Sequence, residues 1–169
     1  GGDVIVISSK FISNSQGRIL EISNSKVCNK AKEIAKKFNS NEKFMEIVFR
    51  ESDNIIGGVT GFVMSTTDGI LAPNAGIDKS NSKGTKIILY PNEPYKFAEE
   101  LKRKIFLELN LHIGVIIVDS RLMPARIGTT GVTIACAGIE PTRDLRGEKD
   151  LNGNPLKVTF QATADNLAS

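Results

Sequence analysis

The stretch that decides the fold is Ile113-Gly114-Val115-Ile116-Ile117-Val118, followed directly by Asp119 and Ser120. A near-continuous apolar run is typical of a strand buried on both faces, so we expect it at the centre of a sheet. Before it, Pro94 opens a segment with the apolar spacing of a helix, which predicts a helix packed on that sheet. The helix positions expected to be buried are Phe97, Leu101, Ile105 and Leu109.

Shorter patterns on either side predict the remaining elements. Ser25 is the expected N-cap of a helix over residues 26–38, and a second helix is expected over residues 42–50. Strands and helices mix without strict alternation, so the expected class is α+β, a mixed sheet with packed helices. The predicted strands cover residues 4–7, 62–66, 85–90, 132–139 and 156–160. The β-branched run of residues 4–7 indicates a buried strand, and Gly57 and Gly58 are expected to break the chain before the strand over 62–66.

The composition is that of a globular protein. The 169 residues are 40% hydrophobic and 24% charged, which excludes a disordered tail, a collagen-like repeat and a coiled-coil rod. We expect residues 1–169 to form a single domain taken from the middle of a longer chain. Both cysteines, Cys28 and Cys136, are expected to be reduced core residues, because two cysteines without a C-x-x-C pair make no disulfide framework or metal site.

The charge pattern bears on partners and compartment. The net charge of +3 is too small to indicate nucleic acid and suits anionic small molecules. The lysines of residues 26–37 read better as a solvated helix face than as a nucleic-acid site. No apolar run long enough for a membrane span and no signal peptide are present in these residues, so the cytoplasm is the default expectation.

Several catalytic signatures are missing from the sequence. It contains no G-x-x-x-x-G-K-[ST] loop, no G-x-G-x-x-G after a strand and no G-x-S-x-G elbow. The only histidine, His112, has no partner histidine and is expected to be a surface or turn residue.

Two aspartates are candidates for a metal site. Asp119 follows the central strand, at a sheet rim where ligands gather, and Asp78 stands in the polar loop of residues 73–81. Carboxylates are ligands that Mg²⁺ and Mn²⁺ prefer, together with phosphate oxygens of a substrate. Each aspartate could instead cap a turn through backbone amides, and spacing alone does not show that the two meet.

Together the motifs resemble a known family. Asn74-Ala75-Gly76-Ile77-Asp78-Lys79-Ser80-Asn81 is similar to the N-A-G-[IV]-D-x-S-N box of the coenzyme F-420 gamma-glutamyl ligases. Further matches follow the family's order over nearly the whole chain: residues 2–6, Gly17-Arg18, 50–53, 115–120, Gly131-Val132, Ala137-Gly138, 146–151, Val158-Thr159 and Ala164-Asp165.

The resemblance implies an α+β homodimer that joins L-glutamate to a deazaflavin coenzyme precursor with GTP as co-substrate. It implies Mn²⁺ or Mg²⁺, assistance by K⁺, and an acyl phosphate that the glutamate amine attacks. It further implies chain before Gly1 and after Ser169, including a glycine-containing nucleotide-binding stretch. Two alternatives stay open: a ligase-like scaffold with another acceptor, and a non-catalytic binding or assembly domain.

Site residues carry over by position, and no catalytic residue is assigned. The resemblance implies metal binding by Asp78, Asp119 and Ser120. It implies nucleotide binding by Ser9, Lys10 and Asn81. This chain departs from the family at Asn14, where a lysine is usual, and at residues 121–124, where F-G-R or N-G-R is common. The first change weakens phosphate binding, and the second alters a loop beside the expected metal site.

Overall fold

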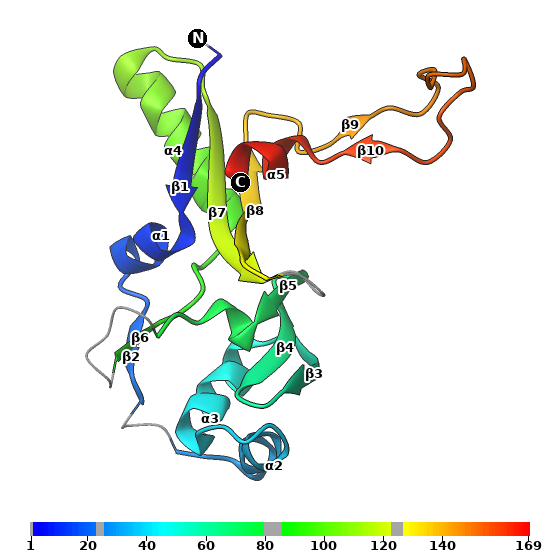
Figure 1. Cartoon of the computed structure of the whole chain (residues 1–169). Coiled ribbons are helices and arrows are strands. Elements are labelled where there is room, and N and C mark those ends of the chain that lie inside the picture. The colour runs from blue at the N-terminus through cyan, green and yellow to red at the C-terminus, as the bar shows by residue number, and fades with distance from the viewer. Residues whose placement is uncertain (1, 23–25, 80–85, 123–126) are drawn as a thin grey trace. The chain divides into compact units, whose positions relative to one another are not determined.

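The computed structural model describes residues 2–22, 26–79, 86–122 and 127–169. By internal contacts the chain divides into two compact units, each described by itself: unit 1 is Gly1–Ser8 with Glu93–Ser169, and unit 2 is Ser9–Asn92. Both mix helices with small sheets (Figure 1), which confirms the predicted α+β class.

Unit 1 is built on a sheet of order β1-β7-β8. The predicted central strand is confirmed: β7 (Gly114–Leu122) pairs in parallel with β1 (Val4–Ser8) and antiparallel with β8 (Thr129–Ala137). The helix α4 (Pro94–Leu109) lies against this sheet in Figure 1, and α5 (Thr163–Ala168) packs on β8. A short ribbon of β9 (Arg143–Asp144) and β10 (Phe160–Gln161) completes the unit.

Burial in unit 1 corrects three predictions. The strand β1, expected to be buried, leaves Val6 45% exposed, because among the described residues it pairs only on its β7 side. The stripe of α4 is only partly buried, and its last member, Leu109, is 62% exposed. Of the strand expected over residues 156–160, only Phe160 is in a strand, as the first residue of β10. Residues 145–159 form mostly turns instead of a paired ladder.

Unit 2 contains three strands that pair as β3-β4-β5 and two that form the ladder β2-β6, with the helices α1, α2 and α3. The bounds of its elements are α1 (Ser9–Ser15), β2 (Ile19–Glu21), α2 (Asn29–Lys37), α3 (Glu42–Glu51), β3 (Asn54–Val59), β4 (Phe62–Thr67), β5 (Ile70–Pro73), the short turn η2 (Asn74–Gly76) and β6 (Lys86–Ile88).

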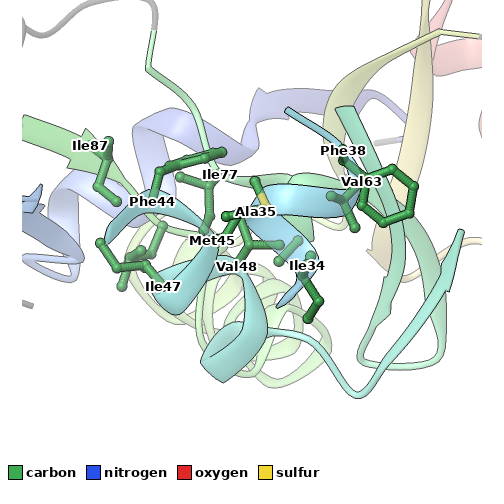
Figure 2. Close-up of a cluster of buried hydrophobic side chains, with 12 residues drawn as sticks. Ile34, Ala35, Phe38, Phe44, Met45, Ile47, Val48, Val63, Ile77 and Ile87 are labelled. Carbon is green, nitrogen blue, oxygen red and sulfur yellow. The ribbon is translucent and has the colours of Figure 1, made fainter. Parts of the chain in front are cut away.

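The core of unit 2 lies between α2, α3 and the strands (Figure 2), in a cluster that includes Phe44, Met45 and Ile87. The predicted helix over 42–50 is confirmed as α3, with Phe44, Ile47 and Val48 buried. The helix predicted over 26–38 begins later, at Asn29. Its N-cap is Cys28 and not Ser25, which lies outside the described residues.

The helix α1 and the strands β2, β3 and β5 of unit 2 were not predicted. The helix α1 follows β1 directly, and β3 runs through Gly57 and Gly58, which the sequence suggested as a break. A Cβ at Gly58 would lie 2.4 Å from the carbonyl oxygen of Phe62, so this glycine permits close approach of the paired strands. The exposure of Cys28 also corrects its expected place in the core, because its thiol accepts the N–H of Ala31 as a cap.

Candidate functional site

A left-handed turn in unit 2 leads the chain to Asp78. Asn74, Ala75 and Gly76 have φ values of 50°, 56° and 66°. The side chain of Asn74 accepts a hydrogen bond from the N–H of Val63 at 3.0 Å, and the hydroxyl of Ser65 accepts one from the N–H of Ala75 at 2.9 Å. Because non-glycine residues rarely adopt this backbone, buried side-chain bonds are needed to hold it. Asn74 is therefore a structural residue of the turn.

The backbone of Asp78 is fixed on both sides. Its N–H donates to the carbonyl of Ile88 and its carbonyl accepts from the N–H of Ile88, both at 2.9 Å. Its carboxylate forms an ion pair with the ammonium of Lys10 on α1. The structure thus brings together one residue predicted to bind metal and one predicted to bind nucleotide.

Lys79, which the sequence analysis did not single out, follows Asp78. Its ammonium lies 3.1 Å from the centroid of the Phe44 ring, and Phe44 is 1% exposed. Desolvation lowers the pKa of Lys79 from its ordinary value. A cation over an aromatic face is attracted by the ring quadrupole, so this contact ties the chain after Asp78 to α3.

Arg18 and Glu51 explain two of the matched sequence pieces. The guanidinium of Arg18 forms an ion pair with Glu51, at the end of α3, and donates from Nε to the carbonyl of Tyr90 at 2.9 Å. These bonds join the chain after α1 to α3 and to the chain after β6. Arg18 and Glu51 therefore have a structural role within unit 2.

Asp119 and Ser120 lie in unit 1, on β7. The sequence placed Asp119 at the end of the strand, but β7 continues to Leu122 because β8 pairs with it as far as Thr129. The parallel ladder does end here, since Ser8, the last residue of β1, is opposite Val118. Ligands gather beyond the carboxyl ends of parallel strands, so the predicted rim position holds in this sense.

A β-bulge at Ile134 of β8 lies opposite the junction of Ile117 and Val118, one residue before Asp119. Ile117 pairs with Ala135 and Val118 with Thr133, so the register skips Ile134. Bulges re-aim the side chains that follow them and are enriched next to active sites. Asp119 is partly buried and Ser120 is exposed.

The remaining predicted residues are placed as follows. Ser9 begins α1 and is 7% exposed, and Asn81 lies outside the described residues. Arg121 is 8% exposed within β7, so it is not part of the loop expected there, and Met123 and Pro124 lie outside the described residues. Asp78 belongs to unit 2, and Asp119 belongs to unit 1.

The donor set suits a hard divalent cation. Asp78 and Asp119 offer carboxylate oxygens and Ser120 a hydroxyl, the ligand types that Mg²⁺ and Mn²⁺ take. No cluster of three or more His, Cys, Asp or Glu side chains that could hold a metal occurs in the described ranges. Within its own unit, each carboxylate is of a type that Mg²⁺ and Mn²⁺ take together with substrate phosphate oxygens.

A cavity of about 660 Å³ in unit 1 lies away from Asp119, at the amino ends of β1 and β7. Val4, Gly114 and His112 line it, and the His112 ring lies 4.6 Å from that of Phe106. His112 is exposed, as predicted for a surface residue. Within the part of the chain that the structure describes, no helix is both long and apolar enough to cross a bilayer.

Comparison with known proteins shows the family to which this chain belongs. The family model described as "F420-0:Gamma-glutamyl ligase" matches residues 1–169. The chain belongs to this family. The predicted resemblance is thereby confirmed over the whole chain.

Curated relatives agree with the family model, and each is named Coenzyme F420:L-glutamate ligase. Those of Methanopyrus kandleri and Archaeoglobus fulgidus are 32% and 34% identical, over 99% of this chain and 67% and 68% of their own lengths. That of Methanocaldococcus jannaschii is 36% identical over 99% of this chain and 68% of its own. The chain thus spans about two thirds of the length of these ligases.

Proposed function

We propose that this chain is part of a GTP-dependent amide ligase that adds L-glutamate to the deazaflavin precursor of coenzyme F-420. The observation that carries the proposal is the family match over residues 1–169, which includes the box around Asp78 and the strand β7, on which Asp119 and Ser120 lie. The name shared by the relatives gives the substrate class.

The proposed reaction has two steps. A carboxylate oxygen of the precursor attacks the γ-phosphorus of GTP, and GDP leaves as the acyl phosphate forms. The glutamate amine then attacks the acyl carbon, inorganic phosphate leaves, and the nitrogen loses a proton as the amide forms. Phosphoryl transfer of this kind depends mostly on positioning and on stabilising charge at the phosphates.

In this proposal Asp78, Asp119 and Ser120 hold Mn²⁺ or Mg²⁺. Bound metal supplies positive charge to the nucleotide phosphates. In the same proposal, Ser9, Lys10 and Asn81 contact the nucleotide. Of these three residues, Lys10 forms an ion pair with Asp78, one of the proposed metal ligands. The protein is further proposed to be a cytoplasmic homodimer assisted by K⁺, with small-molecule substrates and neither nucleic acid nor membrane as a partner.

Thermal stability of the full-length protein in the presence of ligands tests the proposal. Saturating GTP with Mn²⁺ should raise the melting temperature of the protein, because a ligand at about 100 times its dissociation constant stabilises the native state by about 2.7 kcal/mol. Asp119→Asn should reduce this shift. Asp3→Asn is the matched control, since Asp3 is an exposed aspartate at the opposite end of the same sheet.

The outcomes separate the alternatives. Absence of any shift with the wild-type protein would contradict the ligase proposal and favour a non-catalytic domain. Nucleotide and metal binding without transfer of glutamate to the precursor would favour another acceptor.

A further inference from the structure

The ion pair between Lys10 and Asp78 joins two groups to which the proposed function gives different ligands. The ammonium of Lys10 is assigned to phosphate, and the carboxylate of Asp78 to a divalent cation. In the structure they neutralise each other. The negative charge of the Asp78 carboxylate would attract a divalent cation, but it already attracts the ammonium of Lys10. The cation and the ammonium therefore compete for the same carboxylate.

We propose that Lys10 occupies Asp78 until a divalent cation displaces it, and that the displaced ammonium then binds the nucleotide phosphates. This inference rests on the proposed function, and it makes Lys10 the residue that couples metal binding to nucleotide binding. By linkage, a nucleotide that draws Lys10 away also strengthens metal binding at Asp78.

The two partners differ in their freedom to move. Asp78 has both backbone groups bonded to Ile88, so its main chain is fixed and only its short side chain can turn when the ion pair opens. Lys10 carries its charge on a flexible four-carbon stem. The side chains of Lys10 and Asp78 are 31% and 26% exposed, so water reaches both groups and the pair can separate at small cost.

Mn²⁺ binding without nucleotide tests the first half of the inference. In the full chain, titrated by calorimetry or by the electron paramagnetic resonance of free Mn²⁺, Lys10→Met should bind Mn²⁺ about three- to tenfold more tightly than wild type, because the competing ammonium is gone. Lys32→Met is the matched control, since it removes the same charge from the exposed face of α2 and should leave the affinity unchanged.

GTP binding in EDTA tests the second half. Asp78→Asn removes the ion pair with Lys10 and should bind GTP about threefold more tightly than wild type. The double variant with Lys10→Met should lose this gain. Asp68→Asn is the matched control, because it makes the same change of charge in an exposed turn. Asparagine tolerates the φ of 50° at this position, so the variant should fold and bind GTP as tightly as wild type.

The results that overturn the inference differ from those that overturn the function. Unchanged or weaker Mn²⁺ binding by Lys10→Met, or a gain in GTP affinity that persists in the double variant, would refute the exchange of Lys10. If Asp78→Asn left Mn²⁺ affinity unchanged, the metal role of Asp78 in the proposed function would fail instead.

Discussion

The left-handed turn before Asp78 depends on Asn74, and Asn74→Ala measures how much. The change removes the acceptor of the Val63 N–H, a buried donor 3.0 Å away. Leaving such a donor unsatisfied costs about 1–3 kcal/mol. Alanine also tolerates the φ of 50° less well than asparagine, at a further cost of up to about 1 kcal/mol. We therefore expect a loss of about 1–4 kcal/mol in the free energy of unfolding, with the larger part from the unsatisfied N–H.

Urea denaturation of the full chain, followed by circular dichroism, gives this free energy. Asn39→Ala is the matched control, because Asn39 also has a positive φ, 47°, but is exposed. It should lose only the backbone contribution, about 1 kcal/mol or less. Equal losses in the two variants would refute the reasoning that the buried Asn74 amide holds the turn.

Three further changes have defined outcomes. Asn14→Lys adds a cation one helical turn after Lys10, so GTP affinity measured by calorimetry should rise about fivefold; no rise would count against a phosphate site on α1. A Cβ at Gly131 would clash with a backbone oxygen of α5, so Gly131→Ala should lower the free energy of unfolding, measured by denaturation, by about 1–3 kcal/mol. Gly57→Ala is the control and should lower it less, because a Cβ there has nothing within 4 Å. Glu46→Gln should destabilise the chain by about 1–2 kcal/mol at neutral pH, and the deficit should vanish as pH falls; a pH-independent deficit would be the contrary result.

The sign of that pH dependence follows from the contacts of Glu46. Its carboxylate accepts hydrogen bonds from the N–H of Cys28 and from Nε of Arg50, both at 2.8 Å. The Cys28 backbone N–H, then the Cys28 side chain, and then Arg50 lower the pKa of Glu46 against the opposing effect of burial. A lowered pKa gives stability that is present above the unfolded pKa of about 4.5 and is lost as pH falls through the folded pKa.

The sequence predicted those elements whose apolar pattern is strong. The run ending at Val118 became the central strand, and the stripe of α3 became its buried face, because burial on both faces or on one face leaves a regular pattern. The strand β3 was missed because Gly57 and Gly58 read as a break, while the reason for Gly58 is the backbone of Phe62 opposite it. Such a contact lies across the ladder and leaves no local signal.

The candidate site was predictable in its residues but not in their contacts. Resemblance singled out Asp78 and Lys10, yet their ion pair joins positions far apart in the chain, and no spacing rule gives it. The bulge before Asp119 is equally invisible in sequence, since it arises from the register between β7 and β8. Asn74, which could be read as a ligand in a polar loop, is used by the backbone of β4 instead.

The most direct test of the central claim is formation of the glutamyl amide by the full-length protein. Incubation with GTP, Mn²⁺, L-glutamate and the deazaflavin precursor, followed by mass spectrometry and phosphate release, should show one GDP and one phosphate for each amide formed. Asp119→Asn should abolish both products while Asp3→Asn leaves them unchanged. Amide formation without GTP consumption, or full activity of Asp119→Asn, would contradict the account.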